Sequence, residues 1–384
     1  MQGIPNSGLQ LRSLITEDGE LILSLEDTPV KAPEPDQILI RVERAPLNPT
    51  DINFLTAVMN MSGAAQGGTP ASPTISANVP QPDMRAMRGR IGQSLPAGSE
   101  GAGTVIAAGA SPSAQALIGR RVTCLCGEMF AEYRTLDVSQ CMPLPDGVTA
   151  EQGASCFVNP LTALSFLETM RGEGHTAIVH SAAASNLGQM LNKICIADGV
   201  PLVNIVRKDE QAEVLRKQDA RLVVNSTSPT FTADLIDAIS ETGATVGFDA
   251  VGGGPLAGQI LSAMSVAANR RVGFLRYGPD RETQVYIYGR LSLDPTTVPP
   301  GVGFAWNLSG YLLMPFLRRA GPEVRDRMQN RVLAELTTTF ASHYTKTISL
   351  REALHLDTLR AYTGLTTGEK YLIDPTLEPS SEKG

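Results

Sequence analysis

A regular alternation of strand-like and helix-like segments between residues 158 and 275 constrains the fold more than any other feature of this chain. Short apolar runs such as 201–207 and 245–251 alternate with segments of helical periodicity such as 187–198 and 256–264. Such alternation predicts right-handed crossovers and a parallel, doubly wound sheet. The expected strands are 176–182, 201–207, 222–226, 245–251 and 270–275, and the expected helices are 161–170, 187–198, 210–218, 232–240 and 256–264.

The chain before residue 150 has a different, β-rich character. Residues 37–44 and 103–109 are typical of strands separated by turns, which predicts an antiparallel, mostly β region. Between them, Ala, Gly, Ser and Pro dominate residues 57–95, and we expect a long loop insertion there. After the alternating region the sequence returns to mixed character, with an amphipathic segment at 322–341 and a final strand in "KYLID".

Composition limits the class of protein and its partners. The chain has 384 residues, of which 42% are hydrophobic, enough for two ordinary cores. Its net charge of −7 disfavours nucleic acids and anionic membranes as partners. No targeting segment and no apolar run near the ~18 residues of a membrane span is found, so we expect a cytoplasmic protein. The five scattered cysteines and four histidines lack the spacing of a disulfide framework or a zinc site, so no metal is expected.

The stretch "IVHSAAASNLGQM" at 178–190 joins an expected strand to an expected helix through very small side chains. A doubly wound sheet binds a pyrophosphate at such a junction, because the helix N-terminus presents free N–H groups and small residues let the anion approach. Gly188 is the single glycine of this stretch, and Ser185 stands where a glycine is usual. The alternative is that the small residues serve only close packing of the helix on the strand.

The end of the next expected strand bears on the choice of cofactor. Dinucleotide sites for NAD usually carry an acidic residue there, whereas this chain has Arg207 and Lys208. A guanidinium pairs well with a phosphate, so the sequence favours NADPH over NADH. The alternative is a solvated pair of charges, and Asp209 and Glu210 follow immediately and could reverse the preference.

The order of several short motifs is similar to that of the medium-chain dehydrogenase/reductase superfamily. The motifs are "LNPTD" (47–51), "PAGSEGAGTV" (96–105), "GEMFAEYRTL" (127–136), "LPDGVTAEQGA" (144–154), "NPLTAL" (159–164) and "FDAVGG" (248–253). The chain lacks the cysteine and the four-cysteine lobe of the zinc-containing relatives, and so resembles the zinc-free quinone oxidoreductases. The resemblance implies an α/β protein in which a GroES-like β-barrel catalytic domain (1–157, with 57–95 inserted) is interrupted by a Rossmann cofactor domain (158–320), and 321–384 returns to the catalytic domain.

The resemblance also implies site residues. Asn48 and Asp51 match a motif that approaches the nicotinamide, and Thr162 matches a threonine that contacts the cofactor at a helix entrance. Cofactor-binding positions are expected at Ser185, Asn186, Leu187, Gly188, Arg207, Lys208, Val251 and Phe274. Structural alternatives are a turn role for Asn48, a helix cap for Thr162 and sheet packing for Phe274.

These features predict an enzyme that transfers a hydride from NADPH to a quinone or related enone without zinc. Asn48 and Thr162 are the candidate donors to the developing oxyanion, and no residue is marked as a general acid. One alternative is an NADPH-dependent enoyl thioester reductase, which "SAAASNLGQ", "NIVR", "YGRLS" and "GFAWNLS" resemble. Those enzymes use a tyrosine after the "NPTD"-like motif, but no tyrosine lies between Asp51 and Glu100. A second alternative is a non-catalytic NADPH-binding protein.

Two further expectations concern surfaces. The resemblance suggests a homodimer formed by edge-to-edge pairing of Rossmann sheets, with 284–291 as the edge strand. We expect the insertion 57–95 to be a lid over the acceptor pocket, since it follows Asp51 closely. Its methionines would give adaptable apolar contact, and its arginines could meet an acidic acceptor or else be solvated or touch a partner subunit. These residues are Met59, Met61, Met84, Met87, Arg85, Arg88 and Arg90.

Overall fold

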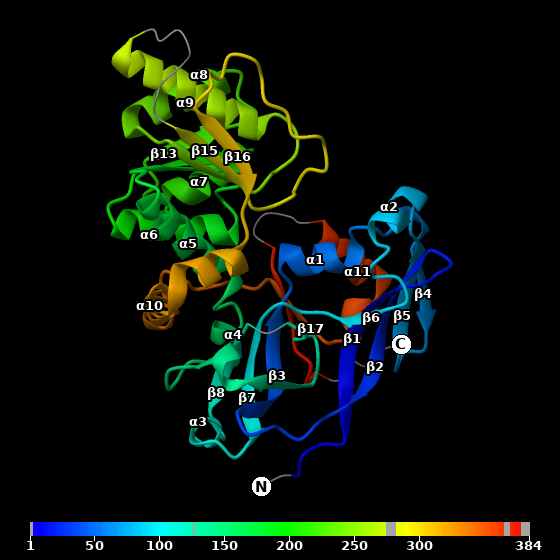
Figure 1. The fold of residues 1–384 in the computed structure, drawn as a ribbon. Coiled ribbons are helices and arrows are strands. Elements are labelled where there is room, and N and C mark those ends of the chain that lie inside the picture. Colours follow the sequence, from blue (N-terminus) through cyan, green and yellow to red (C-terminus); the bar gives the residue numbers. More distant parts are fainter. Residues whose placement is uncertain (1–2, 126, 274–281, 365–368, 378–384) are drawn as a thin grey trace. The chain divides into compact units, whose positions relative to one another are not determined.

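The computed structural model describes residues 3–125, 127–273, 282–364 and 369–377, and its elements are labelled in Figure 1. The chain forms two compact units, the first made of residues 1–158 and 336–384 and the second of 159–335. The C-terminal return therefore begins near residue 336, later than the 321 expected from the sequence. No helix among the described residues is both long and apolar enough to cross a membrane.

The second unit contains a six-stranded, all-parallel sheet in the order β13-β12-β11-β14-β15-β16. Its strands are β11 (Ile178–His180), β12 (Leu202–Val206), β13 (Leu222–Asn225), β14 (Val246–Asp249), β15 (Thr283–Ile287) and β16 (Trp306–Gly310). Its helices are α5 (Val158–Gly172), α6 (Asn186–Ala197), α7 (Asp209–Arg216), α8 (Phe231–Thr242), α9 (Leu256–Val272) and α10 (Leu313–Ala334). The predicted doubly wound α/β architecture is confirmed.

The strand order places a topological switch point inside this sheet. β11 pairs with β12 on one side and with β14 on the other, so the sheet grows in opposite directions from the boundary between β11 and β14. Ligands of open α/β sheets bind beyond the carboxyl ends of the strands at such a point. The loops after His180 and after Asp249 therefore lie at the expected position for a cofactor.

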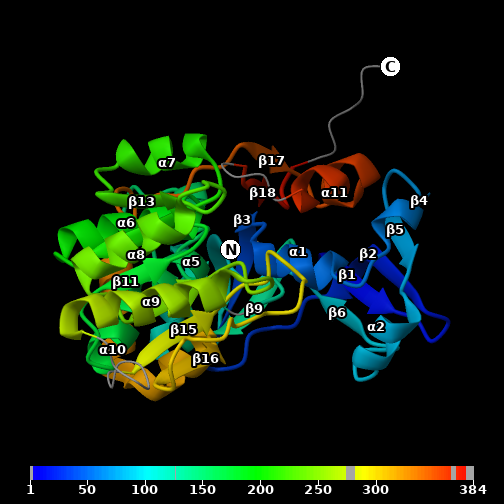
Figure 2. The same cartoon turned by 90° about the horizontal axis from the view of Figure 1, so that it is seen from above.

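The core explains why the strands of this unit read as continuous apolar runs. Helices α8 and α9 run side by side (Figure 2), and their apolar faces form one buried cluster with strand residues. Val203, Val246 and Val285 are fully buried. Strands of parallel sheets are covered on both faces and therefore lack the alternation of half-exposed strands.

Two predictions for the end of the sheet are wrong. Residues 270–272 are the last turn of α9 and not the start of a strand, because no glycine or proline interrupts the helix between Gly258 and Gly273. The strand expected at 284–291 is β15, an inner strand between β14 and β16, so the edge of the described sheet is β16. Phe274 lies outside the described residues.

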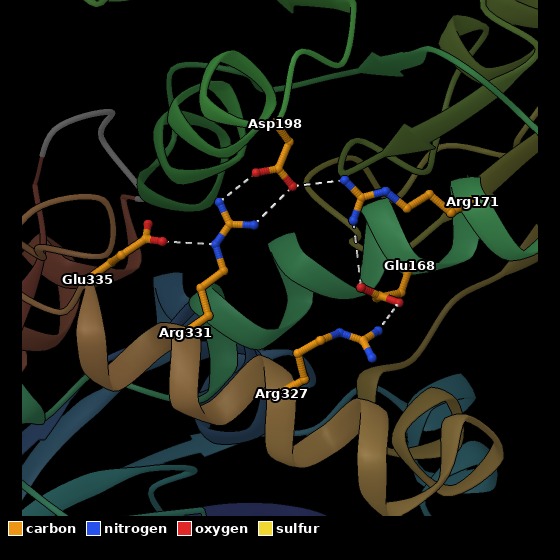
Figure 3. Close-up of polar contacts among 6 residues, drawn as sticks. All are labelled: Glu168, Arg171, Asp198, Arg327, Arg331 and Glu335. Atoms are coloured by element: carbon orange, nitrogen blue, oxygen red, sulfur yellow. Dashed lines mark hydrogen bonds and ion pairs between the residues drawn. The ribbon is translucent and has the colours of Figure 1, made fainter.

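Helix α10 is held to the second unit by a network of ion pairs, drawn in Figure 3. The carboxylate of Asp198, after α6, receives both Nη atoms of Arg331 at 2.9 and 2.8 Å and Nη2 of Arg171 at 2.9 Å. Two further bonds join Arg327 to Glu168 at 2.7 Å and Arg331 to Glu335 at 3.0 Å. The network explains why the amphipathic segment after Pro322 stays with the second unit.

The first unit is built from two sheets. One has the order β4-β5-β2-β1-β6, and the other has the order β10-β8-β7-β3-β18-β17 with β9 also paired to β3. The strands are β1 (Ser7–Ile15), β2 (Glu20–Pro29), β3 (Gln37–Pro46), β4 (Ala65–Gly68), β5 (Pro73–Asn78), β6 (Ser94–Pro96), β7 (Gly101–Ala108), β8 (Arg121–Cys124), β9 (Tyr133–Asp137), β10 (Cys141–Pro143), β17 (Lys346–Ile348) and β18 (Tyr371–Ile373). The short helices are α1 (Pro49–Thr56), α2 (Gln81–Ala86), α3 (Pro112–Gln115), α4 (Ala150–Gly153) and α11 (Leu356–Thr363), with 3₁₀ turns at Met61–Gly63, Val138–Gln140 and Glu352–Leu354.

The C-terminal segment completes this unit. In the antiparallel pairing of β18 with β3, Leu372 lies opposite Pro46 and Ile373 opposite Ala45. Leu372 and Ile373 are fully buried. The end of the chain therefore supplies core residues to a sheet whose other strands come from the first 150 residues.

The segment 57–95 is not the loop that its composition predicted. Its strand β5 pairs with β2, and Ile75, Ala77 and Val79 are buried in the core of the unit. Composition hid this because the alternating apolar residues are separated by Ser, Thr and Pro. Arg90 is also structural, since its guanidinium donates to Ser13 Oγ at 2.6 Å and lies over the Phe54 ring. The role of this segment as a lid stays a prediction.

Candidate active-site residues

Asn48 and Asp51 lie together at the start of α1 in the first unit. The backbone N–H of Asn48 donates to Asp51 Oδ2 at 3.0 Å, and Ser99 Oγ donates to Asp51 Oδ1 at 2.5 Å. Burial raises the pKa of Asp51 to about 6, against the opposing effect of these hydrogen bonds. Both carboxylate oxygens are thus engaged, and Asp51 fixes the helix start and the turn at Ser99.

Glu100 is a buried carboxylate that the sequence analysis did not single out. It accepts hydrogen bonds from Asn48 Nδ2 and from the backbone N–H groups of Phe157 and Val158, each at 2.9 Å. Burial raises its pKa, while Lys370 and the three donors oppose that shift. Because Glu100 requires a donor, it sets the orientation of the Asn48 amide. One amide hydrogen of Asn48 is therefore already committed to Glu100.

Lys370, Ser155 and Tyr344 form a second part of this polar cluster. The ammonium of Lys370 donates to Ser155 Oγ at 2.8 Å, and Ser155 Oγ lies 2.7 Å from the Tyr344 hydroxyl. Burial lowers the pKa of Lys370 to about 8, and the carboxylates of Glu100 and Asp51 oppose that shift. The only sequence signal for this group was a lysine directly before the apolar final strand.

In the second unit, Ser185 and Gly188 have clear structural roles. Ser185 is the N-cap of α6, and its Oγ accepts the Gly188 N–H at 3.2 Å. A Cβ atom on Gly188 would lie 2.2 Å from the Ala183 carbonyl oxygen, so only glycine allows this approach of helix to loop. Asn186 and the buried Leu187 form the first turn of α6. The packing alternative therefore accounts for Gly188, and contact of these residues with a pyrophosphate stays a prediction.

The loop before α6 has the backbone of a close-approach site. Ala182 has φ +49°, a left-handed conformation that side-chain-bearing residues seldom adopt. Strain of this kind persists where surrounding structure enforces it, and it is frequent in ligand-binding segments. The α6 N-terminus follows directly, so the small residues expose backbone N–H groups to an anion.

Asp249 joins the two loops at the switch point. Its fully buried carboxylate accepts from Ser181 Oγ at 2.5 Å and from the N–H groups of Val251 and Gly252 at 2.9 and 3.0 Å. The loop after β11 and the loop after β14, which carries the predicted Val251, are therefore held by one side chain. Asp249 stood inside a quoted motif, but nothing local indicated this bond to Ser181.

Arg207 and Lys208 lie where β12 ends and α7 begins, and both are exposed. The Arg207 backbone N–H donates to Gln211 Oε1 at 2.9 Å, which shapes the turn. The neighbouring Asp209 accepts from Asn225 Nδ2 at 2.8 Å. The acidic residue that could have favoured a ribose hydroxyl is thus turned toward β13.

Thr162 is buried in α5 of the second unit, and its carbonyl accepts a bond from Ser165 Oγ at 2.7 Å. It belongs to a different unit from Asn48 and Asp51, which are neighbours in the first. Across the described residues there is no group of three or more His, Cys, Asp or Glu side chains placed to hold a metal ion.

Comparison with known proteins agrees with this architecture. Residues 34–146 match the family model described as the alcohol dehydrogenase GroES-like domain. A solved structure of a protein assigned as an NADPH:quinone reductase of Mesorhizobium loti is 28% identical to the chain, with a TM-score of 0.73, and covers 97% of this chain and 100% of its own.

Curated relatives match over shorter segments. A quinone oxidoreductase of Pseudomonas aeruginosa is 29% identical over 158 residues, 40% of this chain and 48% of the relative. A mitochondrial enoyl-[acyl-carrier-protein] reductase of Caenorhabditis elegans is 26% identical over 193 residues, 48% of this chain and 46% of the relative. The chain thus matches about half the length of these relatives. Together the findings confirm that this is a protein of the medium-chain dehydrogenase/reductase superfamily, similar to its quinone oxidoreductases and enoyl reductases.

Proposed function

We propose that this chain is an NADPH-dependent oxidoreductase that reduces a quinone or related enone without zinc. The observation that carries the proposal is the arrangement at the switch point of the second unit, where Asp249 ties together two loops built for close backbone approach. The N-terminus of α6 follows one of these loops. Such a site suits a dinucleotide.

The residues around this point fit NADPH. The small side chains at 181–185 leave the backbone N–H groups accessible to a pyrophosphate, and exposed Arg207 and Lys208 offer positive charge to a 2′-phosphate. Asp209, the acidic rival, is engaged with Asn225. When bound, NADPH supplies a hydride from its dihydronicotinamide. The predicted contacts of Ser185, Asn186, Leu187 and Gly188 with the cofactor are part of this proposal, as is that of Val251.

The acceptor is the less constrained half of the proposal. A quinone or enone develops negative charge on oxygen as it receives a hydride, so hydrogen-bond donors stabilise the transition state. Thr162 keeps its place as a candidate donor, and Asn48 contributes whichever amide hydrogen Glu100 does not use. The likeness to an NADPH:quinone reductase over nearly the whole chain supports this acceptor class.

An enoyl thioester acceptor is the second candidate, and the similarity to the C. elegans enoyl reductase favours it. Loss of NADPH absorbance should be followed with a panel of a quinone, a simple enone and crotonyl-CoA. We expect turnover of the quinone or enone and strong preference over the thioester. Turnover confined to the thioester contradicts the acceptor class, and tight NADPH binding with no turnover favours the non-catalytic alternative. One tightly bound zinc per chain, found by elemental analysis, contradicts the zinc-free chemistry.

We also propose a homodimer that pairs through β16, in place of the strand first expected. β16 is the edge of the described sheet, and the segments beside it carry strongly exposed apolar side chains, namely Leu293, Phe304 and Leu312. An open edge flanked by apolar residues is a ready surface for strand pairing. A monomeric mass at micromolar concentration contradicts this pairing.

A further inference from the structure

The reduction proposed above needs a proton as well as a hydride, and the polar cluster of the first unit contains several groups that could supply it. Two carboxyls are poorly suited because their oxygens are already engaged. Asp51 accepts from Ser99 and from the Asn48 backbone, and Glu100 accepts three N–H groups. Each bond stabilises the ionised carboxylate and occupies a lone pair that a proton would need.

Two other groups hold their protons too tightly. Burial raises the pKa of the Tyr344 hydroxyl and of the Cys156 thiol well above their ordinary values. Neither group releases a proton readily near neutral pH. Lys370 is different, because its ammonium is desolvated and has one hydrogen-bond acceptor, Ser155 Oγ, among the described residues. An ammonium has three N–H donors, so Lys370 retains donors for a further partner.

We propose that Lys370 donates the proton in this reduction, held by Ser155 and Tyr344 and balanced by the buried carboxylates of Glu100 and Asp51. The inference rests on the proposed oxidoreductase function and deepens it by naming the acid that the sequence did not mark. Lys370 sits over the Tyr344 ring, 5.4 Å from its centroid, in addition to the bond to Ser155. The ammonium is therefore fixed from two sides.

The proton and electron balance is simple. The acceptor gains two electrons and one hydrogen as hydride from NADPH, and its oxyanion or enolate then takes one proton from the Lys370 ammonium. NADP⁺ and neutral lysine remain, and solvent returns the proton to Lys370. Glu100 and Asp51 stay ionised throughout, since their donors do not move.

The charged groups around Lys370 set the pH dependence. Glu100 precedes β7, Asp51 lies in α1 and Tyr344 precedes β17, and burial of the ammonium outweighs the two carboxylates so that its pKa falls to about 8. An acid must be protonated to act, so kcat should be constant below that pH and fall as pH rises through it. A lysine in water would hold its proton to about 10.4.

Three variants of the full-length protein test the role by pH profiles of NADPH oxidation with the accepted quinone or enone. Lys370→Met should lower kcat by about 100-fold or more and remove the alkaline limb. Lys370→Arg should keep the charge while moving the limb beyond the measured range, because arginine does not deprotonate there. Lys346→Met is the matched control, since Lys346 is an exposed lysine of β17 in the same unit, and it should leave the profile unchanged.

A second measurement does not depend on turnover. Lysine-selective ¹³C labelling, with the Lys370→Arg spectrum used for assignment, gives the titration of Lys370 directly. Titration near pH 8 supports the proposal, and titration near the ordinary lysine value overturns it. An alkaline limb that persists in Lys370→Met overturns the role while leaving the oxidoreductase function intact. No turnover of any acceptor by the parent protein refutes the function itself, and the role of Lys370 with it.

Discussion

The two units organise their buried polar residues in opposite ways. In the second unit the bonds that shape the candidate cofactor site are mostly local, as between Ser185 and Gly188 or between Asp249 and Val251. In the first unit the polar cluster is assembled from distant segments, and Glu100 alone joins Asn48 to the backbone at 157–158. A local site leaves a readable motif, whereas a cluster built from remote segments does not.

The largest effect should follow from breaking the remote cluster. Glu100→Gln removes a buried carboxylate from three donors and from Lys370, and we expect the free energy of unfolding to fall by about 3 kcal/mol. Chemical denaturation at pH 7 measures it. Glu17→Gln is the control, because Glu17 is exposed, and should change stability by less than about 0.5 kcal/mol. Equal, small effects of both substitutions would show that the cluster is loosely held.

The next effect tests the local geometry of the second unit. Gly188→Ala places a methyl group against the Ala183 backbone and should cost about 2 to 3 kcal/mol of unfolding free energy. Gly172→Ala, at the end of α5, meets nothing within 4 Å and should be neutral or stabilise by up to about 1 kcal/mol. Thermal unfolding of the pair distinguishes a packing requirement from a general glycine effect. Similar melting temperatures for the two variants would contradict it.

Cofactor choice provides a third test. Arg207→Ala should weaken NADPH binding by about 1.5 to 3 kcal/mol and leave NADH binding nearly unchanged, because the lost interaction is a charge-assisted bond to the extra phosphate. Calorimetric titration with both cofactors measures this. Lys217→Ala, an exposed lysine just beyond α7, should alter neither affinity. If Arg207→Ala weakens both cofactors equally, the assignment of the phosphate contact is wrong.

The smallest effect concerns the ion pairs that hold α10. Hydrogen bonds from Arg331 are the main cause that lowers the pKa of Asp198. A lowered carboxyl pKa contributes stability above the unfolded value near 4, and that contribution is lost as pH falls through the folded value. Asp198→Asn should therefore cost about 1 kcal/mol at pH 7, and the difference from the parent protein should shrink below about pH 4. A cost independent of pH would mean that packing, not charge, fixes α10.

The sequence predicted the second unit well because its signals are periodic and local. The alternation from 158 to 264, the capped entrance of α6 and the basic pair at Arg207 and Lys208 are all visible within short windows. Its errors arose where a local signal was misread, as when α9 continued to Val272 or when β15 became an inner strand beside β16.

The first unit was harder to predict for a physical reason. Residues 57–95 join a sheet through β5 and its pairing with β2, and pairing partners of a strand leave no trace in its composition. Likewise Glu100 and Lys370 meet only because β18 returns to β3 after more than two hundred intervening residues. Asn48 and Asp51 were found through a motif, but the residues that orient them were not.

The central claim is that this chain passes a hydride from NADPH to an electron-poor carbon. Isotope transfer tests it most directly, with NADPH deuterated at C4 on the transferred face and an enone acceptor whose carbon–hydrogen bonds do not exchange with water. The account predicts one deuterium on the β-carbon of the reduced enone, detected by mass spectrometry and NMR, and faster labelling with NADPH than with deuterated NADH. Reduced product without deuterium, or no product at all, would contradict it.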